Sequence, residues 1–400
     1  MIGSLPLNAP PQLEGRIIPA LEAVEARLLD VVSNADETIN PPTSHLAEAG
    51  GKRLRPVLTL LTAQLGDTGL AVGEQVLDAG VAVELTHIAT LYHDDVMDEA
   101  PLRRGAPSAQ TVWGNSAAIL TGDVLVARAS QLVAALGPRA VLAHAKTFER
   151  LCMGQLHETL PRPAGTDPVD HYIRVLADKT GSLIAMSARY GAMLARAGDA
   201  TERIVEEFGE KIGVAFQLAD DVIDLASDSE TTGKTPGTDL REGVDTMPVL
   251  LLRKALAAGE LDAAGQSILS RLSTGNLDDD AVLADIVARL RLHPVLARTR
   301  EMAMTWAREA VGVLEGLEDA VPHNSYLYYG YRFKAHLAAE RGVVLIAKDY
   351  MHMAIHAMEI PPAYEQGLAE AFAATHENAP WILREIDRAT PNPEGLHWDI

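Results

Sequence analysis

Apolar residues recur at spacings of three and four from Leu13 to about residue 317, as they do along amphipathic helices. The first such stretch, LEGRIIPALEAVEARLLDVVSNADE, begins at Leu13, and no run with the alternation of a β-strand competes with it. The other segments with helical patterning are residues 56–66, 73–98, 115–136, 139–160, 168–196, 201–227, 246–258, 279–291 and 294–317. The pattern therefore predicts an all-α protein.

Turn-forming residues separate these predicted helices. GDTG occupies 66–69, PRPAGTDP occupies 161–168 and SDSETTGKTPGTD occupies 227–239, and clusters of this composition mark loops. Residues 1–12 are rich in proline and predict a loose start. We find no repeat of fixed period along the chain.

Composition supports the helical prediction and divides the chain. Aromatic residues make up only 4% against 48% apolar residues in all, and alanine and leucine abound, which favours helices over sheets. Yet ten of the eighteen aromatic residues lie beyond residue 320. We therefore predict a catalytic domain over 1–320 and a separate C-terminal extension over 321–400, aromatic-rich and partly helical.

Net charge restricts the partners. The formal charge is -21, from 34 basic against 55 acidic residues, so the protein repels nucleic acid and anionic membranes. An anionic ligand then needs a local basic cluster or bound cations. The single cysteine, Cys152, excludes an intramolecular disulfide and a cysteine-based zinc site. With no signal-peptide pattern and no uninterrupted apolar run of about 18 residues, we expect a cytoplasmic protein without a transmembrane segment.

The stretch HDDVMDEAPLRRG concentrates acidic residues in the predicted helix 73–98. With Asp94 taken as zero on a helical wheel, Asp98 lies at about 40° and Asp95 at about 100°, so the three carboxylates share one face. Like charges at this spacing destabilise a bare helix, and the helix dipole disfavours anions near its C-terminus. A bound cation would offset both effects.

Two interpretations of this cluster are open: a solvated acidic helix end, or a site for a hard cation such as Mg²⁺, which binds one or two carboxylates plus water and phosphate oxygens. His87 and Thr90 extend the polar face deeper, while the rest of the helix is apolar nearly all round. This pattern indicates a buried helix with a functional polar face.

The stretch QLADDVID at 217–224 repeats the arrangement, because Asp220, Asp221 and Asp224 again span about 100° of a helix. Two such faces opposed across a cavity could hold several divalent cations. A diphosphate could then bridge those cations.

Basic residues suited to a diphosphate lie in three short segments. AGGKRLRP at 49–56 presents Lys52, Arg53 and Arg55 after a flexible Gly-Gly pair. Arginine binds phosphate oxygens in a bidentate manner and lysine supplies a point charge. Ordinary surface basicity is the alternative, although it explains a compact trio in so acidic a protein poorly. DKTGS at 178–182 and TGKTPGTD at 232–239 add Lys179, Thr180 and Lys234.

These motifs, in this order, resemble those of the trans-isoprenyl diphosphate synthases, the polyprenyl synthetase family. The matching elements are GGKRLRP, ELTHIATLYHDDVMDEAPLRRG, GNSAAILTGD, DKTGSL, GVAFQLADDVIDL and GKTPGTDLREG, which together span about residues 45–250. The resemblance implies the all-α isoprenoid synthase fold, in which helices surround a deep central cavity with both aspartate motifs at its mouth.

The resemblance also implies a role for each matching residue. Several Mg²⁺ ions around an allylic diphosphate would be bound by Asp94, Asp95, Asp98, Asp220, Asp221 and Asp224. Of these, the surest ligands are Asp94, Asp98 and Asp220. The allylic diphosphate itself would be contacted by Arg103, Lys179, Thr180, Gln217 and Lys234. The diphosphate of isopentenyl diphosphate would be held by Lys52, Arg55, His87 and Arg104. The group taken as catalytic is Asp94, Asp95, Asp98, Lys179, Asp220 and Asp221.

The implied reaction suits these residue types. Metal ions and basic groups stabilise the departing diphosphate, and an allylic cation forms. The double bond of isopentenyl diphosphate attacks it in a 1'-4 condensation, and a proton is then lost to the released diphosphate. Ala89 and Thr90, the fifth and fourth residues before Asp94, place no aromatic plug in the cavity. The chain therefore resembles medium- to long-chain synthases with products of roughly C30 to C50.

Two regions depart from the family pattern. The segment EGVDTMP carries Val244 where the family often has a lysine, so one basic contact is missing. Beyond about residue 320 the chain matches nothing that we recognise as part of the family. There, His352 and His356 are four residues apart and could ligate a metal, although such a pair equally fits a packing face.

Two other functions remain open beside the prenyltransferase. A class I terpene cyclase would ionise the same diphosphate but needs no isopentenyl diphosphate site, so intact Lys52, Arg55 and His87 argue against it. A catalytically silent subunit of a heteromeric synthase is disfavoured by two complete aspartate motifs. A homodimer is expected from the resemblance.

Overall fold

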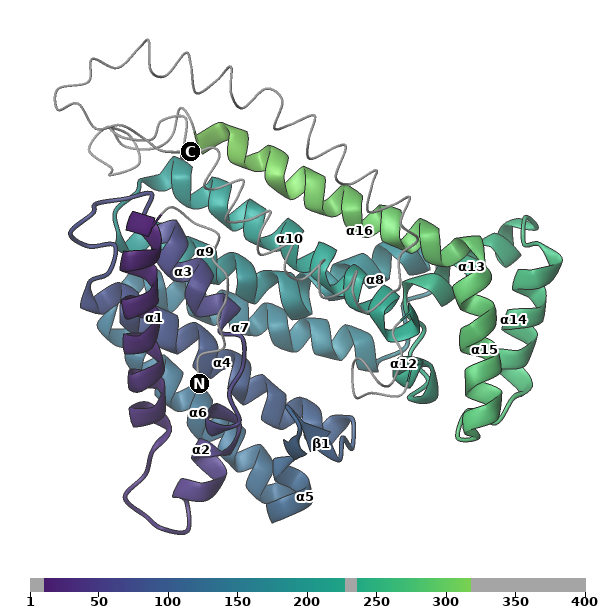
Figure 1. The fold of residues 1–400 in the computed structure, drawn as a ribbon, viewed down its shortest axis with the longest axis horizontal. Coiled ribbons are helices and arrows are strands. Elements are labelled where there is room, and N and C mark those ends of the chain that lie inside the picture. Colours follow the sequence, from purple (N-terminus) through teal and green to yellow (C-terminus); the bar gives the residue numbers. More distant parts are fainter. Residues whose placement is uncertain (1–10, 227–235, 318–400) are drawn as a thin grey trace.

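The computed structural model describes residues 11–226 and 236–317, and this part of the chain is helical apart from one short hairpin (Figure 1). Its longer helices are α1 (Pro11–Val32), α2 (Asn40–Glu48), α3 (Leu54–Ala63), α4 (Glu74–Met97), α6 (Asn115–Ala135), α7 (Pro138–Thr159), α8 (Pro168–Leu176), α9 (Ser182–Leu194), α10 (Asp199–Ala226), α13 (Met247–Ala258), α14 (Ala263–Thr274), α15 (Asp280–Leu292) and α16 (Pro294–Val313). The short elements are β1 (Leu102–Arg103), β2 (Ala106–Pro107), α5 (Ala109–Trp113), a π turn (Ala177–Gly181), α12 (Thr238–Arg241) and a 3-10 turn (Leu314–Gly316). The prediction of an all-α fold is confirmed.

Helix α4 lies at the centre of the fold. It packs against α6 on one side and against α3 and α9 on the other, and α7 in turn packs against α6 and α9. Val81, Ala82 and Val83 on α4 are completely buried although successive side chains point about 100° apart around the helix. This matches a helix that is apolar nearly all round, and it fixes the end of α4, which carries the first aspartate motif.

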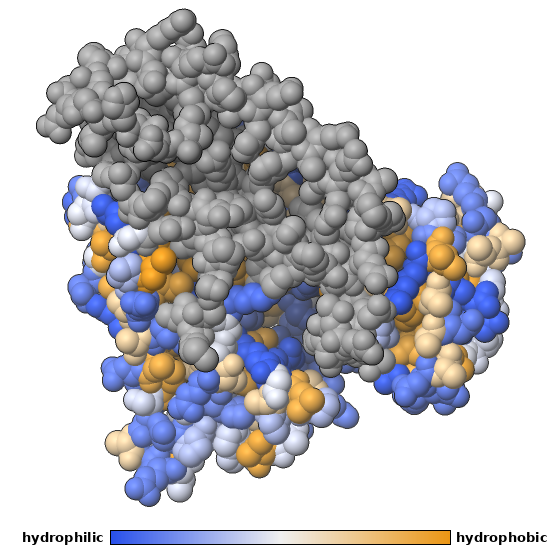
Figure 2. Space-filling view, viewed as in Figure 1, coloured by the Kyte–Doolittle hydropathy of each residue, from blue (hydrophilic) through white to orange (hydrophobic). Residues whose placement is uncertain are grey.

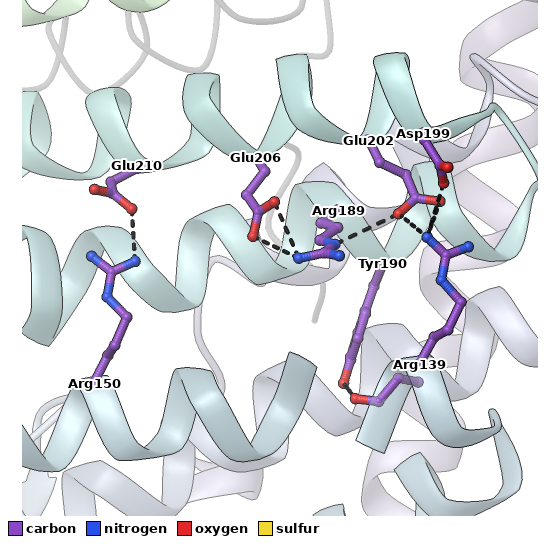
Figure 3. Close-up of polar contacts among 9 residues, drawn as sticks. Arg139, Arg150, Arg189, Tyr190, Asp199, Glu202, Glu206 and Glu210 are labelled. Carbon is purple, nitrogen blue, oxygen red and sulfur yellow. Dashed lines mark hydrogen bonds and ion pairs between the residues drawn. The ribbon is translucent and has the colours of Figure 1, made fainter. Parts of the chain in front are cut away.

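Helix α10 carries the second aspartate motif and is held by a row of ion pairs (Figure 3). Glu202, Glu206 and Glu210 recur every four residues and so share one face of α10. Their partners are Arg139 of α7 at 2.9 Å, Arg189 of α9 at 2.9 Å and Arg150 of α7 at 2.7 Å, respectively. Since α10 continues without a break to Ala226, these pairs also set the rotation of its aspartates.

A second apolar cluster joins the end of α10 to α13, α14, α15 and α16. Leu218, just before the aspartate motif of α10, and Val222, within it, are buried in this cluster. The aspartates therefore lie where the central bundle meets this cluster, with α13 to α15 projecting from one end of the molecule (Figure 1).

Among the longer helices, the structure differs from the predicted elements in three places. The predicted helix 168–196 is interrupted by the π turn Ala177–Gly181. Helix α2 was not predicted because it begins with Pro41 and Pro42, yet proline suits the first turn, where its missing N–H is not needed. Helix α14 was not predicted either, since its sequence is rich in small and polar residues. It begins at the side-chain cap of Asp262, which accepts a hydrogen bond from Gly265 N.

The predicted extension over 321–400, with His352 and His356, lies outside the described residues. Among the residues that are described, one helix, α6, is long and apolar enough to cross a membrane by length and composition alone. A core helix of a soluble protein passes the same test, and α6 packs along α4. Apolar and polar side chains are interspersed over the described residues visible in Figure 2.

Candidate active site

The three aspartates of the first motif have different surroundings at the end of α4. Asp94 is half-buried and Asp98 is exposed, whereas Asp95 is completely buried. Asp95 Oδ1 accepts a hydrogen bond from Arg103 Nε at 2.5 Å, and its Oδ2 is buried without a hydrogen bond. The outer aspartates therefore face the site, and the middle one anchors the hairpin that follows the helix.

Burial is the main cause of the altered acidity of Asp94. It raises the pKa of this carboxyl to about 6, with a further contribution from Asp98 and an opposing one from Lys179. The pKa of Lys179 is raised in turn, because Glu158, Asp94 and Asp98 outweigh the effect of burial, which acts to lower it. Asp94 is costly to ionise, and Lys179 beside it stays charged. The two therefore suit a ligand that brings cations to the carboxylate and negative charge to the lysine.

Lys179 reaches the first motif from the π turn between α8 and α9. Its Nζ forms an ion pair with Glu158 Oε2 at 2.5 Å. Gly154 of α7 packs so closely against this turn that a Cβ atom there would lie 2.7 Å from Lys179 N. Thr180, in the same turn, is half-buried. Single π turns are common at functional sites, and this one brings a lysine to the end of α4.

The second motif repeats the division between outer and middle aspartates. Asp220 and Asp224 are half-buried, whereas Asp221 is buried. Both carboxylate oxygens of Asp221 accept from the hydroxyl of Tyr172, at 3.0 and 3.1 Å, and one also accepts from Met247 N at 3.0 Å. Asp221 thus joins α8, α10 and α13 behind the site.

The acidity of Asp221 follows from this enclosure. Burial raises its pKa to about 8, with contributions from Asp239 and Asp220, while the hydrogen bonds from Met247 and Tyr172 act in the opposite direction. Asp224 accepts a hydrogen bond from Thr238 N at 3.2 Å, which ties the motif to the start of α12.

Of the three basic residues Lys52, Arg53 and Arg55, Arg53 has a structural role. It is 4% exposed, and its guanidinium pairs with Glu84 at 3.0 Å and with Glu25 at 2.6 Å. It therefore links the loop before α3 to α4 and α1. Lys52 and Arg55, its neighbours on either side, are exposed and half-buried respectively. Removing one partner of so deeply buried a pair is strongly destabilising, which makes Arg53 a support for the loop.

Arg104 supports the same loop from the hairpin β1–β2. Both Arg104 and Gly105 have positive φ, 53° and 78°, as a type I′ hairpin turn requires. The Arg104 guanidinium donates to Leu46 O at 2.8 Å and to Gly50 O, and lies 3.7 Å from Glu84. These contacts hold the strained residue in place and bring the hairpin against the Gly-Gly loop.

His87 lies among the basic residues. Burial is the main reason that its pKa is well below the ordinary value, and the charges of Arg55, Arg104 and Arg103 act in the same direction. Lys52 is exposed as a whole residue, but partial desolvation of its ammonium group lowers its pKa, against the opposing charge of Asp220. The basic group therefore extends from the interior beside α4 to the second aspartate motif.

The predicted residues thus come together in linked groups. Lys179 and Arg103 accompany the first motif, Lys52 accompanies the second, and Arg55 and Arg104 surround His87. Gln217 is half-buried on α10, one turn before the second motif, and Val244 is half-buried between α12 and α13. Ala89 is buried and Thr90 half-buried on α4. Lys234 lies outside the described residues.

Sequence reasoning missed several polar residues at the site. They are Glu158 beside Lys179, Tyr172 on Asp221, Asp239 near Asp221, and Glu84 on Arg53. Each is a single polar residue in or beside an otherwise ordinary helix, so no local pattern marks it. Tyr172 was the most visible, because tyrosine is rare in this chain.

The atoms of the two aspartate motifs that could coordinate a metal ion fit a hard divalent cation. All are oxygen atoms, and Asp95 keeps one buried oxygen without a partner. Within residues 11–226 and 236–317, no three acidic, histidine or cysteine side chains are grouped closely enough to hold a metal ion by themselves. This suits Mg²⁺, which usually takes one or two carboxylates and completes its shell with water and substrate phosphates.

An all-α bundle with two aspartate motifs and nearby cationic side chains defines the class of isoprenoid synthases. The family model for polyprenyl synthetase matches residues 36–275. The nonaprenyl diphosphate synthase of Mycobacterium tuberculosis is 45% identical over 294 residues, which cover 73% of this chain and 85% of that protein. The chain therefore belongs to the polyprenyl synthetase family, and the prediction of a prenyltransferase is confirmed.

Two solved structures are similar throughout the described bundle. A geranylgeranyl pyrophosphate synthase from Corynebacterium glutamicum, complexed with calcium and isoprenyl diphosphate, has a TM-score of 0.66 and 38% identity, covering 83% of this chain and 98% of its own. A decaprenyl diphosphate synthase from Rhodobacter capsulatus has a TM-score of 0.68 and 32% identity, with the same coverage of both chains. They confirm the predicted isoprenoid synthase fold.

Replacing Gly154 by alanine tests the placement of Lys179. The added methyl would lie 2.7 Å from Lys179 N and displace the π turn, so we expect the condensation rate, kcat/KM, to fall about tenfold or more. The matched control is Gly312→Ala on α16, where no atom lies within 4 Å of an added Cβ. Steady-state kinetics that show equal activity for both variants would contradict the proposed role of the turn.

Replacing Asp94 by asparagine tests the cost of its charge. The pKa of Asp94 is raised to about 6, above the ordinary value that it has in the unfolded chain. Between these two pH values the folded protein holds a proton that the unfolded chain has lost, so stability falls as pH rises through this range. In metal-free protein we therefore expect Asp94→Asn to raise the unfolding midpoint at about pH 8 and to have little effect near pH 4. Thermal unfolding in the presence of a chelator measures this, and an effect independent of pH would contradict it.

Proposed function

We propose that this protein catalyses the Mg²⁺-dependent 1'-4 trans condensation of isopentenyl diphosphate with an allylic diphosphate, giving a medium- to long-chain polyprenyl diphosphate. The observation that supports it most is the pairing of each aspartate motif with its own lysine, Lys179 with the first and Lys52 with the second. A separate basic group around His87 offers a place for a second diphosphate.

We assign the metal ions to the outer aspartates, with Asp94, Asp98 and Asp220 as the principal ligands and Asp224 beside them. When bound, Mg²⁺ supplies Lewis-acid stabilisation of the charge that develops on the departing diphosphate. Asp95 and Asp221, predicted as ligands as well, are buried against Arg103 and Tyr172. We therefore propose that these two act mainly by orienting the helix ends.

The basic residues are assigned to two diphosphates. Those proposed for the allylic substrate are Arg103, Lys179, Thr180, Gln217 and Lys234. Those proposed for isopentenyl diphosphate are Lys52, Arg55, His87 and Arg104. Since its pKa is well below the ordinary value, His87 is neutral near pH 7 and can donate a hydrogen bond to phosphate from one ring nitrogen. Fixed donors of this kind need little reorganisation when the allylic bond breaks.

The product class rests on the small residues beneath the first motif. Ala89 and Thr90 are small, and the relatives include a nonaprenyl and a decaprenyl diphosphate synthase. Another similar structure is a geranylgeranyl pyrophosphate synthase, so likeness alone does not give a length. We propose a medium- to long-chain product because no aromatic side chain fills the first turn of the cavity.

We further propose that the enzyme is a cytoplasmic homodimer formed through α6 and α7. These neighbouring helices expose a set of large apolar residues: Ile119, Leu120, Val124, Val141, Leu142, Met153 and Leu156. A second copy that presents the same face would bury them in a symmetric interface. Helix α6 is apolar and only one-third buried, and a dimer interface would cover its exposed part without a membrane.

Turnover of labelled substrates tests the proposed reaction. Pure protein incubated with Mg²⁺, radiolabelled isopentenyl diphosphate and farnesyl diphosphate should yield elongated polyprenyl diphosphates, and Asp94→Ala should lower the rate by a factor of 10³ or more, since metal-assisted stabilisation contributes at least ~4 kcal/mol. Cyclic hydrocarbon as product would instead identify a terpene cyclase. Turnover only after addition of a second protein would identify a subunit of a heteromeric synthase.

A charged residue in the apolar face tests the dimer. Leu120 on α6 is 63% exposed, and we expect Leu120→Glu to shift the protein from dimer to monomer because a carboxylate would be buried in the interface. The control is Leu292→Glu on α15, where the leucine is 88% exposed and outside the proposed interface. Light scattering after size-exclusion chromatography measures the mass. A monomeric wild type, or a variant that remains dimeric, would contradict this interface.

A further inference from the structure

The π turn Ala177–Gly181 lies between α7 and α10 and packs against both helices. Each contact is made at a glycine. A Cβ atom on Gly154 of α7 would lie 2.7 Å from Lys179 N, and one on Gly213 of α10 would lie 2.6 Å from Gly181 Cα. Side chains at these two positions would therefore force the turn away from the helices. The position of Lys179 depends on how α7 and α10 are held against the turn.

One side chain joins all three elements. Arg150 lies on α7, one helical turn before Gly154. Its Nε donates a hydrogen bond to Asp178 Oδ1 in the π turn at 2.7 Å, and its Nη1 donates to Glu210 Oε2 of α10 at 2.7 Å. Figure 3 shows the contact with Glu210. Because Asp178 immediately precedes Lys179, this bridge lies one residue from the lysine assigned to the allylic diphosphate.

The bridge depends on the shape of the guanidinium group. Its planar fork presents nitrogen donors in fixed directions, and both bonds are short and charge-assisted. Burial acts to lower the pKa of Arg150, but the hydrogen bonds to Glu210 and Asp178 outweigh it, so the pKa is raised and the group stays charged. A lysine has a single terminal nitrogen and cannot reproduce this fork between two elements.

The other two arginines in the row along α10 lack this link to the turn. Within the described residues, Arg139 and Arg189 form ion pairs only with side chains of α10 (Figure 3). The side chains of Arg189 and Arg150 are similarly exposed, at 31% and 38%, and each pairs with a glutamate of α10. Arg189 is therefore a matched control for the loss of one ion pair to that helix.

We propose that Arg150 is a positioning residue for Lys179. By joining the π turn to α7 and α10, it fixes the place where Lys179 meets the allylic diphosphate. The proposal rests on the prenyl-elongating function proposed above, in which Lys179 binds that diphosphate. Since α10 also carries the second aspartate motif, the bridge sets Lys179 relative to both motifs. Arg150 itself contacts no substrate in this account.

Two variants separate the bridge from a simple effect of charge. Arg150→Met and Asp178→Asn both break it, but the first removes a positive charge and the second a negative one. If only charge mattered, the first would weaken binding of the anionic substrate and the second would strengthen it. We expect both to raise the KM for the allylic diphosphate about tenfold, because a displaced Lys179 no longer matches its ligand.

The KM for isopentenyl diphosphate should stay unchanged in both variants, since its proposed binding residues lie outside the π turn. Steady-state kinetics with each substrate varied in turn measures this difference. The double variant should be no worse than Arg150→Met alone, because both substitutions remove the same contact.

Two further variants serve as controls. Arg189→Met removes a comparable ion pair from α10 and leaves the π turn alone, so we expect a lower melting temperature with both KM values unchanged. Arg150→Lys keeps the charge but loses the fork, so the raised KM for the allylic diphosphate should persist.

Amide hydrogen exchange tests the bridge without turnover. Exchange over residues 175–183 should be at least about tenfold faster in Arg150→Met and in Asp178→Asn than in the wild type or in Arg189→Met, because local opening of the turn controls it.

Three results would overturn the assignment: an unchanged allylic KM in folded Arg150→Met, opposite changes in Arg150→Met and Asp178→Asn, or equal effects of Arg150→Met and Arg189→Met. A wild-type KM in Arg150→Lys would also contradict the role of the fork. Absence of turnover in the wild type would instead contradict the proposed function, while hydrogen exchange still decides whether Arg150 holds the turn.

Discussion

The desolvation cost of carboxylates crowded into a buried site is the constraint on which the arrangement of this protein depends. Two helices, α4 and α10, each bring three aspartates to the site, and burial makes their charged forms costly, as the raised pKa values of Asp94 and Asp221 show. No apolar packing relieves this cost. Basic groups surround the aspartates, and in the function that we propose, divalent cations shared with a diphosphate offset the remaining cost.

The scaffold holds the aspartates in place with contacts behind the site. A row of glutamates on α10 pairs with arginines of α7 and α9 (Figure 3). Tyr172 of α8 and Met247 of α13 hold Asp221. On the opposite side, Arg53 and Glu84 join the Gly-Gly loop to α4. The middle aspartate of each motif is part of this scaffold, which leaves the outer aspartates available for the chemistry.

The helical fold and both aspartate motifs could be predicted because their signals are local. Apolar spacing gave 73–98 for a helix that spans Glu74–Met97, and three aspartates within five residues fix a shared face. The supporting pairs could not be predicted, since Tyr172 and Asp221 are 49 residues apart and Lys179 and Glu158 are 21 apart. Such pairs depend on how the helices pack against one another, and a single polar residue in the sequence does not show which residue it will contact.

The central claim is that the two aspartate faces share cations through one diphosphate. Calorimetric titration of Mg²⁺ into the protein, with and without farnesyl thiodiphosphate, tests it most directly. Tight binding of Mg²⁺ should require the diphosphate, and Asp94→Asn and Asp220→Asn, one from each helix, should each weaken it at least about tenfold. Binding of Mg²⁺ that is unaffected by the diphosphate, or by either substitution, would contradict the claim.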